Sequence, residues 1–444
     1  MKRILLLIAV LTCGVCVLAQ NNLVFEPVML SIDSATGMYA AGETVNVYGK
    51  LTSDYDSELV CAVKVNGRVI QRPTPVELKK DTAIVVYSSS FADPAAVQVY
   101  VYPRTNDKKK ASLGFIVEAE GLRPGFDVPE DLESFWASQL KSMRKRKIKS
   151  VLTPVDFPEK LKRFEKKCEL YALEIKMHEG RPVHGYIAWP KNAKEGTLPL
   201  VINLHGAGME RSSMANALDW ANRGHCISID MNAHGYPDDE SKEYYKELER
   251  GELKNYRNRK VVDHESFYFR LMYLRAIRAI DYATTLPLWD GQRIMTMGSS
   301  QGAGQAIAVA GIDKRVGAVY AGVPALTDIG GHLKGHRGGW PSYDKQMLKG
   351  DNIEAEMAVL PYYDCAVLIQ QTEAKLWIEA GLIDTVCPPE CVISAFNVAI
   401  SPDKSLYTYP YRPHSAGKID KRLAQEWRQT IHQPRLKEIV EWLK

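Results

Sequence analysis

The sequence predicts an α/β domain, with a mostly parallel sheet flanked by helices, preceded by a smaller all-β sandwich. Apolar residues alternate in the first quarter of the chain, whereas apolar runs and helical patterns take turns in the rest. A stretch with Gly and Pro at residues 121–125 separates the two. The 444 residues, 45% hydrophobic and 25% charged, suit two or three globular domains. We expect the all-β domain over residues 20–124 and the α/β domain over residues 125–444.

Residues 1–19 are typical of a secretory signal peptide. Two basic residues precede an apolar stretch, and small residues before Gln20 suit signal peptidase. The stretch is shorter than the roughly 20 apolar residues that a membrane-spanning helix needs. We therefore expect cleavage, no membrane span and a secreted or periplasmic protein. A lipoprotein is the alternative, but neither Cys13 nor Cys16 follows the Gly or Ala that lipidation usually requires.

Charge and cysteine content exclude several other classes. A formal net charge of +4 is too small to indicate binding to nucleic acid. Six cysteines follow residue 19, too few for a disulfide scaffold in a chain of this length: Cys61, Cys168, Cys226, Cys365, Cys387 and Cys391. Cys387 and Cys391 are close enough in sequence to pair, but isolated buried thiols are the expectation. Without a zinc-ligand pattern, we expect no metal site.

The first domain is predicted to be a small antiparallel sandwich, immunoglobulin-like in outline. Apolar residues alternate at residues 97–102, and turn signals such as Asn66-Gly67 and Asp93-Pro94 separate the expected strands. Its role stays open between structural support and carbohydrate binding, because its tyrosines suit either.

The second domain is predicted to hold a parallel sheet with its active site at one edge. Apolar strands are expected at residues 198–204, 226–231, 293–297 and 374–380, and an amphipathic helix at residues 267–280. Right-handed crossovers would make these strands parallel, so reactive side chains should lie in the loops at their carboxyl ends.

A G-x-S-x-G motif at residues 298–302 directly follows the strand at 293–297 and opens a helix. Such a strand-to-helix turn is tight enough to require small flanking residues, and it exposes the central hydroxyl above the sheet. Ser300 is therefore the predicted nucleophile, with a glycine-rich turn of no chemical role as the alternative.

A serine hydroxyl needs a base, and the base needs an orienting acid. In folds with this elbow the chain order is Ser, acid, His. Asp384 follows the strand at residues 374–380 and is the predicted acid, with Asp364 as its competitor. His414 is the predicted base, because the other late histidine, His432, lacks a preceding strand.

Two backbone N–H groups are predicted to stabilise the developing oxyanion. The first belongs to Gln301, directly after the nucleophile, and the second to Ala207, in the glycine-containing loop after the strand at 198–204. His205 is expected to brace that loop.

From residue 128 to the C-terminus, the chain resembles the acetyl xylan esterase and cephalosporin C deacetylase family of α/β-hydrolases. Residues 130–136, 268–281, 298–302 and 381–389 carry the resemblance. Two motifs differ, since residues 230–235 lack the family's Arg-Gly-Gln, and Ser415 follows His414 where the family has Glu. His234 could line the pocket in place of the missing side chains, or serve only as a structural loop histidine.

The resemblance implies a secreted serine esterase that removes acetyl or similarly small acyl groups from an oligo- or polysaccharide, without a cofactor. One alternative is a hydrolase of a bulkier sugar ester or a peptide, and another is a non-catalytic carbohydrate-binding protein. The family forms ring-like hexamers, but the added sandwich could block or replace those contacts, so homo-oligomerisation stays open.

Overall fold

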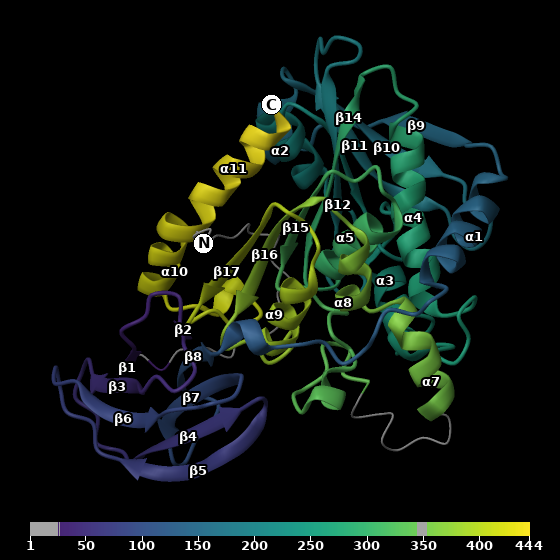
Figure 1. Cartoon of the computed structure of the whole chain (residues 1–444). Helices are drawn as coiled ribbons and strands as arrows, with labels where there is room; N and C mark the ends of the chain where they lie inside the picture. The colour runs from purple at the N-terminus through teal and green to yellow at the C-terminus, as the bar shows by residue number, and fades with distance from the viewer. Residues whose placement is uncertain (1–24, 26, 344–352) are drawn as a thin grey trace.

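The computed structural model describes residue 25, residues 27–343 and residues 353–444. It contains an N-terminal β sandwich beside a larger α/β domain, which confirms the predicted fold class (Figure 1). The predicted signal peptide lies outside the described residues. Within the described ranges, no helix has both the length and the apolar character needed to cross a membrane.

The sandwich consists of a three-stranded and a five-stranded sheet. The three-stranded sheet has the order β1 (Val28–Ser31), β3 (Val45–Leu51), β6 (Ile84–Ser89). The five-stranded sheet has the order β2 (Met38–Tyr39), β8 (Ala111–Val117), β7 (Ala95–Pro103), β4 (Leu59–Val65), β5 (Arg68–Val76). Alternate residues such as Val45, Val47, Val97 and Val99 are fully buried between the sheets, as a period of two requires.

The α/β domain is built on nine strands. Their order is β17 (Lys404–Tyr409), β16 (Lys375–Gly381), β15 (Ala318–Gly322), β14 (Trp289–Ser299), β12 (Leu198–Leu204), β13 (Ile227–Met231), β11 (Val183–Pro190), β10 (Cys168–Ile175), β9 (Ser150–Pro154). Strands β12 to β17 are parallel to one another. Strands β9 to β11 pair antiparallel at one edge, which the sequence did not predict, because β10 and β11 form a hairpin instead of a helical crossover.

Helices cover both faces of this sheet (Figure 1). One face packs against α1 (Leu132–Arg144), α4 (Tyr268–Ala283), α5 (Gln301–Ile312), α8 (Cys365–Leu368) and α9 (Pro389–Val398). The other packs against α2 (Met214–Gly224) and α11 (Gln433–Leu443). Ile202 on β12 joins the first apolar core and its neighbour Val201 joins the second. The remaining described α-helices are α3 (Lys242–Arg250), α7 (Ile353–Val359) and α10 (Lys421–Trp427).

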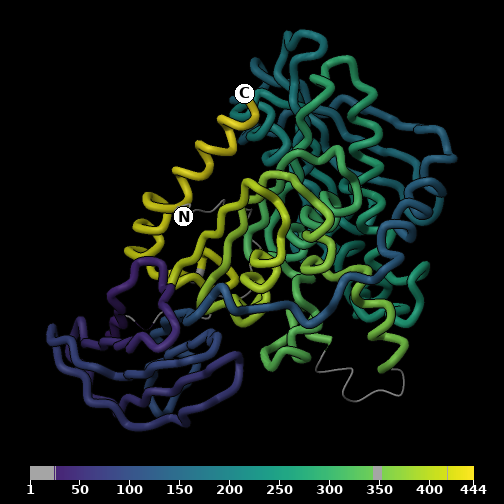
Figure 2. Tube along the Cα trace, viewed as in Figure 1, coloured from purple at the N-terminus to yellow at the C-terminus, as the bar shows by residue number. Residues whose placement is uncertain are grey.

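The sandwich lies against the end of the large sheet that carries β16 and β17. Figure 2 shows its purple trace beside the yellow C-terminal part of the chain. The backbone N–H of Gly114 on β8 donates to the carbonyl oxygen of Pro410, just beyond β17 (2.9 Å). Two segments almost 300 residues apart in sequence therefore meet through their backbones.

Candidate active site

Ser300 stands on a strained turn between β14 and α5. Its φ of 56° and ψ of −123° place a non-glycine residue where side chains are rarely found. The turn needs its glycines, because a Cβ on Gly302 would lie 2.1 Å from the carbonyl oxygen of Leu204. The Ser300 N–H donates to the carbonyl oxygen of Gly322 (2.9 Å), which fixes the turn to β15.

The loops after β16 and β17 bring a carboxylate and an imidazole to this serine. His414 Nε2 lies 3.0 Å from Ser300 Oγ, and His414 Nδ1 lies 2.8 Å from Asp384 Oδ2. The other carboxylate oxygen of Asp384 accepts the N–H groups of Val386 (2.7 Å) and Cys387 (2.9 Å). Asp384 is fully buried. Its carboxylate therefore has one fixed orientation, with a single oxygen directed at the imidazole.

The two competing candidates serve other purposes. Asp364 caps α8, and its carboxylate accepts the backbone N–H groups of Asp328, Ile329 and Ala366. His432 stacks on Trp427, and burial, followed by nearby arginines, lowers its pKa to about 3. Among the described residues, the hydrogen-bonded chain that ends at Ser300 runs through His414 and Asp384.

The segments that hold the two candidate oxyanion donors approach each other at the Ser300 turn. Gln301 is the first residue of α5, so its N–H has no acceptor within the helix. Ala207 follows β12, whose last carbonyl approaches Gly302 so closely that a side chain would not fit between them. The roles of Ala207 and Gln301 as oxyanion donors stay predictions.

A buried ion pair holds the base of the loop that contains Ala207. His205 Nε2 lies 2.5 Å from Asp230 Oδ1, and its Nδ1 lies 3.3 Å from Glu210 Oε2. Burial lowers the pKa of His205, but the Asp230 and Glu210 carboxylates outweigh it and raise that pKa well above its ordinary value. The Asp230 and Glu210 carboxylates therefore fix the His205 side chain at the start of the loop that contains Ala207, as expected for a residue that braces this loop.

Tyr256 is a neighbour of the site that sequence reasoning missed. Its buried hydroxyl donates to the side-chain oxygen of Gln301, and its ring lies against that of His234, whose Nε2 is 3.1 Å from the carbonyl oxygen of Gly208. Burial raises the pKa of Tyr256, so the hydroxyl stays protonated and able to donate. It thus connects the loop of Ala207 to the start of α5. No sequence signal marks this tyrosine, which lies in a charged segment at residues 250–260.

His234 lies behind the same loop. It is 1% exposed, its Nε2 lies 3.1 Å from the carbonyl oxygen of Gly208, and its Nδ1 lies 2.8 Å from the hydroxyl of Tyr268. Burial lowers its pKa to about 4, so the ring is neutral at pH 7. It also lines a cavity of about 290 Å³ with Arg181 and Arg275. Both ring nitrogens are engaged by protein groups, and contact with substrate stays a prediction.

Within the described part of the chain, two groups of side chains have the spacing to hold a metal ion. The ligand atoms of Asp384, Cys387 and His414 lie within 4.8 Å of one another, as do those of Asp328, His336 and Cys391. In the first group the carboxylate and the imidazole already bond to each other, and burial raises the pKa of the Cys387 thiol well above its ordinary value. Such a protonated thiol is a poor metal ligand.

The buried polar atoms of the second group also have partners. Asp328 accepts from the hydroxyl of Ser394 (2.8 Å), and the ring nitrogens of His336 lie 3.0 and 3.3 Å from backbone carbonyl oxygens. All six cysteines after the predicted signal peptide are buried, unpaired thiols, as expected from their spacing.

A mostly parallel sheet with helices on both faces, carrying a serine on a strand-to-helix turn, defines an α/β-hydrolase. Two acetyl xylan esterases are among the solved structures that share this fold. The acetyl xylan esterase from Paenibacillus sp. R4 has a TM-score of 0.60, with 22% identity over 74% of this chain and 99% of that one. Acetyl xylan esterase 1 from Thermoanaerobacterium sp. JW/SL YS485 has a TM-score of 0.56, with 22% identity over 74% of this chain and 98% of that one.

The chain belongs to the acetyl xylan esterase (AXE1) family, whose model matches residues 117–430. This confirms the family predicted from the sequence. A curated relative, the acetyl esterase Axe7A of Xylanibacter ruminicola, is 30% identical over 308 residues, or 68% of this chain. The chain spans 66% of that relative's length, slightly less than two thirds.

Proposed function

We propose that this chain is a serine esterase that removes acetyl or similarly small acyl groups from carbohydrate. The 3.0 Å contact between His414 Nε2 and Ser300 Oγ supports the proposal best, because it pairs a base with a hydroxyl that is otherwise a weak nucleophile. The 2.8 Å contact of His414 with Asp384 adds the orienting acid.

The positions of these side chains support the following reaction. Ser300 Oγ attacks the ester carbonyl carbon while His414 Nε2 accepts the hydroxyl proton. The resulting oxyanion is stabilised by the N–H groups of Gln301 and Ala207, and each such donor lowers the barrier by about 3 kcal/mol. Collapse of the tetrahedral intermediate releases the sugar hydroxyl, which takes its proton from His414, and leaves an acyl group on Ser300. Water, deprotonated by the same imidazole, then hydrolyses the acyl-enzyme.

Acetate release from acetylated xylo-oligosaccharides tests the substrate. The wild-type chain should release acetate, and the Ser300→Ala variant should not. Feruloyl and glucuronoyl sugar esters and aminoacyl amides extend the panel to the alternative bonds. Turnover of one of those compounds without acetate release would refute the acetyl specificity. Binding of the oligosaccharide without turnover of any compound would refute the enzyme and favour a binding protein.

We also propose that the chain is exported and that residues 1–19 are removed. The basic start and the short apolar stretch support this. Intact mass of the protein from the periplasm or medium should correspond to a chain that begins at Gln20. An uncleaved chain in the cytoplasmic fraction would refute it.

A further inference from the structure

We propose that Gln98, in the N-terminal sandwich, is a positioning residue for Asp384, so that the added domain forms part of the catalytic framework. The inference rests on the proposed function, since it concerns the acid of the proposed triad. It gives the sandwich a role beyond the alternatives of general support and carbohydrate binding.

Gln98 lies on β7 and reaches the loop at residues 382–388 between β16 and α9, which carries Asp384 and is called the acid loop below. Its side chain is 2% exposed, and its Nε2 donates to the carbonyl oxygens of Leu382 (3.2 Å) and Asp384 (3.4 Å). One amide of the sandwich therefore holds the backbone of the acid itself and of the residue two positions earlier. Buried carbonyls that lose such a donor are costly, so the loop is favoured in the conformation that keeps both contacts.

Tyr100 fixes the direction of this amide. The Tyr100 hydroxyl donates to Gln98 Oε1 (2.7 Å), and this contact leaves the NH₂ group facing the acid loop. Burial raises the pKa of Tyr100 to about 12, so the hydroxyl remains a donor throughout the neutral range. The amide of Gln98 is thus oriented by a neighbouring residue of the same strand.

The backbone of the sandwich approaches the same two loops. Gly114 lies opposite Gln98 in the register of β7 and β8. A Cβ on Gly114 would lie 2.2 Å from the carbonyl oxygen of Leu382, and its N–H donates to Pro410, four residues before His414. The sandwich therefore contacts the acid loop and the histidine loop at one place.

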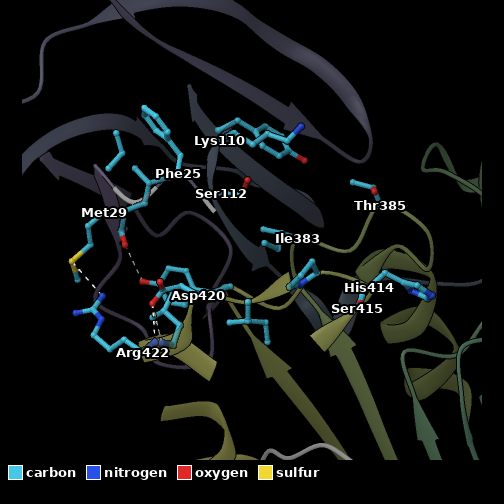
Figure 3. A pocket seen from close by; sticks show the side chains of 18 of the residues that line it. Phe25, Met29, Lys110, Ser112, Ile383, Thr385, His414, Ser415, Asp420 and Arg422 are labelled. Carbon is cyan, nitrogen blue, oxygen red and sulfur yellow. Dashed lines mark hydrogen bonds between the residues drawn. The ribbon is translucent and has the colours of Figure 1, made fainter. Parts of the chain in front are cut away.

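Figure 3 shows this junction from the side of a cavity of about 650 Å³ between the two domains. Ser112 of β8 faces the loop on which Ile383 and Thr385 flank Asp384, and His414 lies beyond it. Because the acid loop is bordered by a cavity on one side, the Gln98 contacts supply restraint that packing there does not. A misplacement of about 1 Å in a catalytic group can lower the rate about 100-fold.

The test compares kcat and KM in a double-mutant cycle. Gln98→Met keeps the length of the side chain and removes the donor. We expect kcat for 4-nitrophenyl acetate to fall about 10- to 100-fold while KM changes by less than about threefold. In an Asp384→Asn background the same change should lower the rate by less than about threefold, because its effect passes through Asp384. Tyr100→Phe removes the hydroxyl that orients the Gln98 amide and should lower kcat by a smaller factor. This variant replaces Gln98→Met in the test if Gln98→Met does not fold.

Asn397→Leu is the matched control. Asn397 on α9 also donates to two backbone carbonyls across the domain boundary, those of Ala119 (2.7 Å) and Leu122 (3.0 Å), and neither carbonyl belongs to the loop that carries Asp384. Its kcat should stay within about twofold of the wild type. An unchanged kcat in Gln98→Met, or equal losses in both backgrounds of the cycle, would overturn the inference. If the wild-type chain shows no ester turnover at all, the proposed function is refuted instead.

Discussion

Replacing Asp384 by Asn should leave the fold intact and reverse the hydrogen-bonding direction of His414. One carboxylate oxygen of Asp384 accepts two backbone N–H groups, and the other accepts His414 Nδ1–H. The amide oxygen of Asn will keep the two backbone donors, so its NH₂ must face Nδ1. His414 then carries its proton on Nε2, which faces Ser300 and cannot accept the hydroxyl proton. In a Ser-His-Asp triad this wrong tautomer lowers kcat about 10⁴-fold, or about 5.4 kcal/mol in barrier.

Single-turnover hydrolysis of 4-nitrophenyl acetate, with enzyme in excess, measures a loss of this size. Asp364→Asn is the control, because Asp364 caps α8 through three backbone N–H groups. It should lower the free energy of unfolding by about 1–3 kcal/mol and leave kcat within about twofold. A loss of less than tenfold in Asp384→Asn, or a larger loss in Asp364→Asn, would refute the assignment of the acid.

Three further outcomes follow from the surroundings of the site. Gly302→Ala places a Cβ 2.1 Å from the carbonyl oxygen of Leu204, so urea denaturation should show a loss of about 1–3 kcal/mol; wild-type stability would contradict the close approach. Tyr256→Phe removes the donor to Gln301 and should lower kcat/KM about tenfold, whereas an unchanged value would separate this tyrosine from the site. His234 has a pKa of about 4 in the fold against 6.5 unfolded, so the unfolded chain gains the proton first and stability is lost as pH falls from 6.5 to 4. His234→Gln has no imidazole to protonate, so over this pH range its free energy of unfolding should fall by about 3 kcal/mol less than that of the wild type. An equal pH dependence of the two proteins would refute the buried neutral ring.

Local patterns in the sequence were enough to predict the strand, turn and helix around Ser300. The tight turn needs glycines at fixed spacing, and the chain order of serine, acid and histidine limits the partners to a few residues. The antiparallel hairpin of β10 and β11 was missed, because its strands are flanked by polar segments that resemble loops. The hairpin joins the sheet through the pairing of β11 with β13, two strands about 40 residues apart in sequence.

The side chains that support the site could not be predicted in this way. Tyr256 meets Gln301 across 45 residues, and Gln98 meets Leu382 across 284. A single tyrosine in a charged segment, or a glutamine in a β-strand, looks like any other until the tertiary fold brings it to its partner. The groups that react are therefore marked by local sequence, whereas the groups that hold them are fixed only by packing.

Covalent labelling with a fluorophosphonate tests the central claim most directly, because the reagent reacts only with an activated hydroxyl. Peptide mapping by mass spectrometry should find one adduct, on Ser300, with labelling abolished in Ser300→Ala and slowed at least about 10³-fold in His414→Ala. An adduct on another residue, or equal labelling rates with and without the imidazole, would contradict a serine activated by His414.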